Sequence, residues 1–289
     1  MKGNFSEKVI IVNFKRFEEI KKRFKRGGER KLSVFSDFER TITKFLVNNE
    51  KIYSLTSILR NSPEYLGKEY SERAKSLFRK YFPFEKNFYL PMELRKKEME
   101  NWWKEHMRLL IKFGLTKETI KRVVKESKLK LRRGAKKFFS FLDKKEIPLV
   151  IISATGLGRE AIKIFLEKEK ILFPNIFIIS NDFFWNENGE AKGVKTPVLH
   201  SLKKEEIELK NYPLLYQKIK KRRNLILLGD MIEDIKMAKI FNYENLLKIG
   251  FLNDSLKRDL KEYKKNFDCV IINDGSMEFV NKILKEICD

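Results

Sequence analysis

The sequence predicts an α/β fold in which a doubly wound, mainly parallel sheet carries an inserted helical cap. Short apolar runs, of the kind expected for strands buried on both faces, alternate with helical stretches over the second half of the chain. One more such run lies near the N-terminus, and a long helical block separates it from the others. Alternating buried strands and helices are typical of a parallel sheet covered on both faces. The helical block is therefore interpreted as an insertion into that sheet domain.

The first part of the chain supplies one strand and the cap. Residues 15–26 show a basic amphipathic pattern that predicts a helix, ended by the glycine pair at 27–28. Residues 32–36 (LSVFS) predict the first buried strand. The helical block follows, with its strongest helices predicted over residues 68–82, 91–113 and 117–126.

The second part of the chain completes the sheet. A helix is predicted over residues 134–145, and the NENG tetrapeptide at 186–189 predicts a hairpin turn. Four more buried strands are predicted over residues 148–153, 175–180, 224–229 and 269–272. We therefore expect a discontinuous sheet domain, residues 1–44 and 129–289, and a helical cap domain, residues 45–128.

The composition excludes several classes of protein. No apolar run approaches the roughly 18–20 residues of a membrane span, and the first residues lack the apolar core of a secretory signal. Two cysteines provide no disulfide framework, and two histidines exclude a multi-histidine metal site. A metal in this protein should be a hard cation held by carboxylates. We expect a cytoplasmic monomer without a membrane partner.

The chain has 63 Lys and Arg against 40 Asp and Glu, a net charge of +23 over 289 residues. Such an excess suggests nucleic acid, and a basic RNA-binding protein stays open as an alternative. The lysines, however, are spread along the chain and often adjoin glutamates, which is typical of solvated helix faces. We therefore do not expect nucleic acid to be the partner.

Functional side chains follow three of the predicted strands. Asp37 follows the first, Ser153 and a Gly-rich turn follow the strand at 148–153, and Asp230 follows the strand at 224–229. Ligands of such sheets bind beyond the carboxyl ends of the strands, so these groups should meet. Neighbouring carboxylates repel unless a cation lies between them, and oxygen ligands favour Mg²⁺. A carboxylate can attack phosphorus, while Ser153, backbone N–H groups and a lysine such as Lys195 hold the phosphate.

This ordered set, with a helical insertion after its first member, resembles the haloacid-dehalogenase-type phosphohydrolases. More narrowly, nearly the whole chain resembles the cytosolic 5′-nucleotidase III group, also called pyrimidine 5′-nucleotidases. The segments that carry this resemblance include KGVKTPVLH, NLILLGDMIEDIKMA and ENLLKIGFLND. The resemblance implies a Mg²⁺-dependent enzyme that hydrolyses nucleoside 5′-monophosphates to nucleoside and phosphate through an aspartyl-phosphate.

The resemblance also implies a role for individual residues. For catalysis and the metal, it implies that Asp37 is the nucleophile and a metal ligand, that Glu39 is the general acid/base with a metal-binding backbone carbonyl, and that Asp230 and Asp234 are metal-site acids. For the phosphate, it implies binding by Ser153, Ala154 and Lys195. For the base, it implies recognition by Glu85, Trp103 and, more loosely, Ser57.

Glu39 departs from the family, which has Asp at this position. Its longer arm predicts either slow hydrolysis or a site adjusted around it, because proton transfer requires a short donor–acceptor distance. A catalytically inactive nucleotide-binding homologue therefore remains an alternative. A phosphotransferase that passes phosphate to another nucleoside is a separate alternative within the same fold. Asp234 is interpreted either as a helix N-terminal acid or as a support for the metal, and His106 is expected at the cap surface or in a hydrogen bond.

Overall fold

The computed structural model describes residues 8–87, 89–254 and 257–289. The strands are β1 (Val9–Ile11), β2 (Leu32–Ser36), β3 (Leu46–Val47), β4 (Glu50–Lys51), β5 (Leu149–Ser153), β6 (Ile176–Ser180), β7 (Phe183–Trp185), β8 (Ala191–Val194), β9 (Asn224–Gly229), β10 (Asn245–Leu252) and β11 (Cys269–Ile272). The α-helices are α1 (Phe14–Gly27), α2 (Leu55–Asn61), α3 (Pro63–Leu66), α4 (Lys68–Lys86), α5 (Met92–Lys112), α6 (Lys117–Glu126), α7 (Ala135–Lys144), α8 (Gly158–Lys168), α9 (Pro213–Ile219), α10 (Lys257–Asn266) and α11 (Glu278–Cys288). Two 3₁₀ helices are relevant to the site, η2 (Lys204–Glu206) and η4 (Ile232–Ile240).

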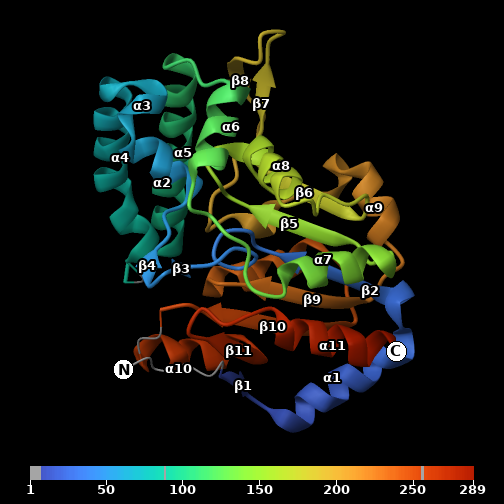
Figure 1. Cartoon of the computed structure of the whole chain (residues 1–289). Coiled ribbons are helices and arrows are strands. Elements are labelled where there is room, and N and C mark those ends of the chain that lie inside the picture. The colour runs from blue at the N-terminus through green and yellow to red at the C-terminus, as the bar shows by residue number, and fades with distance from the viewer. Residues whose placement is uncertain (1–7, 88, 255–256) are drawn as a thin grey trace.

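A seven-stranded sheet with the order β1-β11-β10-β9-β2-β5-β6 forms the centre of the molecule (Figure 1). Its strands pair in parallel except β1, which runs antiparallel to β11 at the edge. The α/β fold with a mainly parallel sheet is therefore confirmed, as are the five predicted strands. β2, the strand before Asp37, lies between β5 and β9, which brings the three predicted strand ends side by side.

Helices cover both faces of the sheet because each strand alternates apolar side chains between them. On one face α1, α7, α8 and α11 pack in a core that includes Val34, Ile151 and Ile226. On the other face α9 and η4 pack against Phe35 and Leu227. The doubly wound arrangement follows from strands that are apolar on both sides.

Helices α2 to α6 form a compact group at one end of the sheet (Figure 1). Two of the three predicted cap helices agree closely with α5 and α6, and α4 continues four residues further, to Lys86. The short helices α2 and α3 were not predicted. The division of the chain at residues 45 and 128 remains a prediction. No helix within the described ranges is long and apolar enough to cross a membrane.

A buried arginine holds the loop that follows β2. Arg132 has no exposed surface on its side chain, and its guanidinium donates hydrogen bonds to the carbonyls of Arg40 and Thr41. It also forms an ion pair with Asp274 at 3.0 Å, just beyond β11. A buried charge of this kind is tolerated only when paired and hydrogen-bonded. The loop that carries Asp37 is thus fixed by a segment more than 200 residues later in the chain.

Candidate active site

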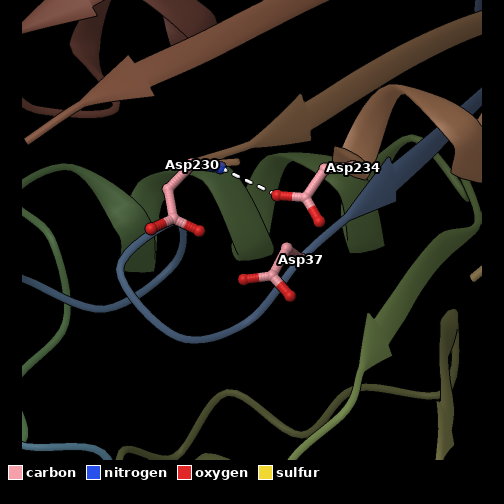
Figure 2. A group of neighbouring side chains, drawn as sticks. All are labelled: Asp37, Asp230 and Asp234. Atoms are coloured by element: carbon pink, nitrogen blue, oxygen red, sulfur yellow. Dashed lines mark hydrogen bonds between the residues drawn. The ribbon is translucent and has the colours of Figure 1, made fainter. Parts of the chain in front are cut away.

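Three aspartates meet at the carboxyl edge of the sheet (Figure 2). Asp37 directly follows β2, and its backbone N–H continues the sheet by donating to the Leu228 carbonyl at 3.0 Å. Asp230 directly follows β9, and Asp234 lies in the first turn of η4. One side-chain oxygen from each aspartate lies within 4.8 Å of the others. The sequence prediction that these strand ends bring carboxylates together is correct.

Lys204 contacts two of these carboxylates. Its ammonium lies 2.6 Å from an oxygen of Asp37 and 2.7 Å from an oxygen of Asp234, and only 3% of the residue is exposed. Burial alone would lower the pKa of Lys204, but the charges of Asp234 and Asp37 outweigh it and raise that pKa. Lys204 is therefore a fixed positive charge inside the site.

The carboxylates still outnumber the ammonium. When all three carboxylates are ionised, one ammonium leaves two negative charges, which is the charge that a divalent cation would neutralise. Burial, the dominant cause, raises the pKa of Asp37 to about 7, with a further rise from the charge of Asp234 and an opposing effect from Lys204. Burial and the charges of Asp37 and Asp234 also raise the pKa of Asp230 well above its usual range. The all-oxygen donor set and its excess of negative charge fit Mg²⁺.

Asp234 is an acid at a helix N-terminus, one of the two roles that the sequence left open, and its support for a metal stays a prediction. One of its carboxylate oxygens accepts the backbone N–H groups of Asp230 at 3.1 Å and Met231 at 2.9 Å, as an acid in the first turn of a helix does. The other oxygen accepts from Lys204. Asp234 therefore holds the backbone of Asp230 and the ammonium of Lys204 in place.

The predicted phosphate-binding lysine does not reach this group. Lys195 pairs with Asp182 at 2.7 Å, and about half of its side chain is exposed. Lys204, nine residues later, contacts Asp37 instead. The physical reason is that Lys195 follows the β7–β8 hairpin, whose strands pair with each other and not with the main sheet. Lys204 could not be recognised in a lysine-rich sequence, since nothing in the pattern distinguishes a buried lysine from its exposed neighbours.

Ser153 and Ala154 lie at the end of β5 as predicted, and Ser153 is buried. The loop that follows them is tied to the cap. The Gly156 N–H donates to the Thr56 hydroxyl of α2 at 3.0 Å. His106 of α5 lies so close that a Cβ on Gly156 would meet its Nε2 at 2.5 Å. The loop after β5 is therefore packed directly against two of the helices α2 to α6, namely α2 and α5.

Glu39 points toward the cap as well. Its carboxylate accepts the backbone N–H of Leu55, the first residue of α2, at 3.1 Å. Burial raises the pKa of Glu39 above its usual value, which is the direction that a general acid requires. The Glu39 side chain is not a member of the described group of three aspartates, so its predicted metal contact rests on its backbone carbonyl alone.

The three predicted base-recognition residues all lie in the cap. Glu85 accepts a hydrogen bond from the Ser201 hydroxyl at 2.7 Å, three residues before Lys204. Ser57 on α2 accepts from Arg60 at 3.0 Å. The Trp103 ring is partly buried between Trp102 and His106, whose rings lie 5.0 and 5.4 Å away.

His106 is not at the cap surface, and within the described chain its Nε2 has no hydrogen-bond partner. The expectation of a surface or hydrogen-bonded histidine is therefore wrong for this nitrogen. Burial lowers the pKa of His106 to about 3, and the charge of Arg60 contributes to the decrease. The neutral ring is held between the cap aromatics and the Gly156 loop, a placement that helix periodicity alone could not reveal. The Trp103 Nε1 is likewise buried without a partner in the described residues.

The loop after Asp230 also contacts the cap. Glu233, in the first turn of η4, lies 3.7 Å from the Arg95 guanidinium, and both side chains are buried. A buried ion pair is costly to break by removing one partner. It therefore connects α5 to the loop that carries Asp230.

The sequence is similar to those of known 5′-nucleotidases over nearly its whole length. A family model described as "Pyrimidine 5′-nucleotidase (UMPH-1)" matches residues 40–288. The chain is 34% identical over 280 residues to a mouse protein named 7-methylguanosine phosphate-specific 5′-nucleotidase, covering 96% of this chain and 92% of that protein. It is 31% identical over 263 residues to a Caenorhabditis elegans protein named putative cytosolic 5′-nucleotidase 3, covering 89% and 69%.

Solved structures agree with the fold. A crystal structure of cytosolic 5′-nucleotidase IIIB bound to cytidine superposes with a TM-score of 0.88 at 25% identity, covering 98% of this chain and 94% of that one. A phospho-aspartyl intermediate analogue of phosphoserine phosphatase superposes with a TM-score of 0.50 at 20% identity, covering 87% and 97%. The second likeness extends to the fold alone, which is that of the haloacid-dehalogenase-like hydrolases.

Proposed function

Because the chain belongs to the pyrimidine 5′-nucleotidase family, we propose that it hydrolyses nucleoside 5′-monophosphates through a phosphoryl group carried on Asp37. The observation that supports this most directly is the buried contact of Lys204 with Asp37 and Asp234, beside Asp230. An aspartate nucleophile needs neighbours that fix its position and balance the charge of an incoming phosphate. The ammonium of Lys204 both fixes the carboxylate of Asp37 and supplies positive charge for an incoming phosphate.

The substrate phosphate would bind at the ends of β2 and β5. The Ser153 hydroxyl, the Ala154 backbone N–H and the Lys204 ammonium would hold its oxygens, with Lys204 in the place first assigned to Lys195. Asp37 and Asp230, with the backbone carbonyl of Glu39, would hold Mg²⁺ while Asp234 supports them. Bound Mg²⁺ would neutralise charge on the phosphate and align it with Asp37.

Two steps complete the reaction. A carboxylate oxygen of Asp37 attacks phosphorus, the bond from phosphorus to the 5′ oxygen breaks, and Glu39 donates a proton to that oxygen. Water then attacks the phosphorus of the aspartyl-phosphate, Glu39 takes a proton from the water, and phosphate leaves with Asp37 restored. Glu39 thus acts first as acid and then as base, a sequence that its raised pKa supports.

The base would bind in the cap. Trp103 offers a ring for stacking and Glu85 offers a carboxylate that accepts N–H groups of a base. The mouse relative is named for 7-methylguanosine phosphate, and the similar crystal structure contains cytidine. A purine or a pyrimidine is therefore proposed as the base. A cytosolic location is proposed from the name of the Caenorhabditis elegans relative.

A panel of nucleotides tests the activity. We expect purified protein with Mg²⁺ to release phosphate from at least one of the 5′-monophosphates of cytidine, uridine, guanosine and 7-methylguanosine. Chelation of the metal should stop the release, and added Mg²⁺ should restore it, because the carboxylates would otherwise repel the phosphate. No phosphate release from any of these nucleotides, with Mg²⁺ binding shown by calorimetry, would refute the enzyme assignment.

Variants at Glu39 test its role. Glu39→Gln should lower kcat by about 10²- to 10³-fold, since Gln neither donates nor accepts a proton in this way. Glu39→Asp should lower it by about tenfold, because the shorter arm cannot keep its contact with the Leu55 N–H. Rates of phosphate release at saturating substrate measure both effects. If the wild type is inactive and Glu39→Asp creates activity, the chain is instead a nucleotide-binding homologue that has lost catalysis.

A further inference from the structure

Arg60 places a positive charge at the predicted base site. It lies on α2, four residues after the Thr56 that contacts the phosphate-binding loop. Its guanidinium donates to the Ser57 hydroxyl at 3.0 Å and lies 3.9 Å from the centre of the Phe78 ring. The side chain is partly buried, and in the described part of the chain it forms no ion pair with a carboxylate. Because a guanidinium does not lose its proton in proteins, this charge persists at every working pH.

Aromatic rings connect Arg60 to the stacking residue. The Phe78 ring lies 5.9 Å from Trp102, and Trp102 lies 5.0 Å from Trp103. The Arg60 charge also reaches His106, on the other side of Trp103, where it helps to lower the pKa of the imidazole. A base stacked on Trp103 would therefore lie next to rings that adjoin Arg60, within reach of its positive potential.

Nucleobases differ in how they respond to such a potential. Guanine is neutral and presents O6 and N7 as acceptors, which a guanidinium recognises well. Methylation at N7 removes that acceptor and gives the base a positive charge. In a partly buried pocket, where water screens charges weakly, like charges repel appreciably. Glu85, near the end of α4, accepts a hydrogen bond from Ser201, and within the described residues it forms no ion pair with Arg60.

We propose that Arg60 is a specificity-determining residue that favours nucleotides with a neutral base over those with a cationic, N7-methylated base. This inference rests on the proposed 5′-nucleotidase function. It predicts that the chain is less selective for 7-methylguanosine phosphate than the names of its relatives indicate.

The effect of the Arg60 charge on base preference can be tested with two substrates that differ by one methyl group and two variants that differ in charge. The ratio of kcat/KM for 7-methylguanosine monophosphate to that for guanosine monophosphate should rise about tenfold in Arg60→Met, which keeps an unbranched side chain but removes the charge. The same ratio should change by less than about twofold in Arg60→Lys, which keeps the charge. Circular dichroism and thermal unfolding establish that both variants are folded.

An isosteric substrate supports the test without any variant. The wild type should prefer 7-methyl-7-deazaguanosine monophosphate, which has the methyl group but no positive charge, about tenfold over 7-methylguanosine monophosphate. An unchanged ratio in Arg60→Met, an equal change in Arg60→Lys, or equal use of the two methylated substrates would overturn the proposal.

An absence of hydrolysis would refute the proposed 5′-nucleotidase activity without deciding the role of Arg60. Dissociation constants for the same nucleotides, measured in Asp37→Asn, report the charge preference in the absence of chemistry. Loss of hydrolysis with a retained binding preference would refute the proposed activity and support the role of Arg60. Tight binding of both bases without preference would refute the role of Arg60 alone.

Discussion

Asp37→Asn is expected to lower phosphate release by about 10⁴-fold or more, because an amide cannot attack phosphorus as a carboxylate does. The substitution keeps the size of the side chain and removes one negative charge from a crowded group, so the fold should persist. Release of phosphate from the preferred nucleotide measures the loss. Nucleotide binding should remain, since the cap, Ser153 and Lys204 are unchanged.

Two controls make this result specific. Asp143→Asn makes the same chemical change on α7, away from the described carboxylate group, and should leave the rate within about twofold. Acid quenching with labelled nucleotide should trap label on the wild type and not on Asp37→Asn. Near-normal turnover in Asp37→Asn would show that another residue is the nucleophile.

Lys204→Met is expected to lower kcat/KM by about 10²- to 10³-fold, because it removes a buried charge that positions Asp37 and that would hold the phosphate in the proposed reaction. The matched variant Lys195→Met should change kcat/KM by less than about twofold, since this lysine is half exposed and contacts Asp182 at 2.7 Å. The same phosphate-release assay measures both variants. Together they decide between the lysine first assigned to phosphate and the lysine that lies in the site.

Stability must be followed in the same experiment. Lys204→Met leaves Asp37 and Asp234 without their buried partner and should destabilise the fold by about 3 kcal/mol without Mg²⁺. Urea unfolding with and without Mg²⁺ separates this loss from the catalytic one, and Lys204→Arg, which keeps the charge, should recover stability more than activity. A large rate loss in Lys195→Met with an unaffected Lys204→Met would reverse the assignment.

Much of the fold was predictable because the strand pattern is strong. Strands β2, β9 and β11 agree with their apolar runs residue for residue. β10 was missed because Lys248 and Gly250 interrupt its apolar pattern. Gly250 is required there, since a Cβ would meet the Phe267 ring at 2.7 Å. β1 was missed because a three-residue edge strand carries too few positions to show a period.

Some residues of the candidate site were predictable from the sequence, and others were not. Asp37 and Asp230 were predictable because they directly follow strand ends, and Asp234 because it comes four residues after Asp230 at the start of a helical segment. Lys204 was not, because it comes from a 3₁₀ turn whose place depends on packing between cap and core. The buried positions of Thr56 and His106 against the Gly156 loop likewise depend on how the cap closes. Tertiary packing, and not local pattern, determines these contacts.

The contact of Arg132 with Asp274 has a consequence for the order in which the chain folds during synthesis. Asp37 leaves the ribosome early, yet its strand pairs with β5 and β9, and its loop is held by Arg132 together with the segment after β11. Contacts so distant in sequence form late, since the intervening chain must first be made and ordered. Asp37 of a nascent chain therefore lacks these contacts at first, and they are completed only when β9 and the segment after β11 have been synthesised.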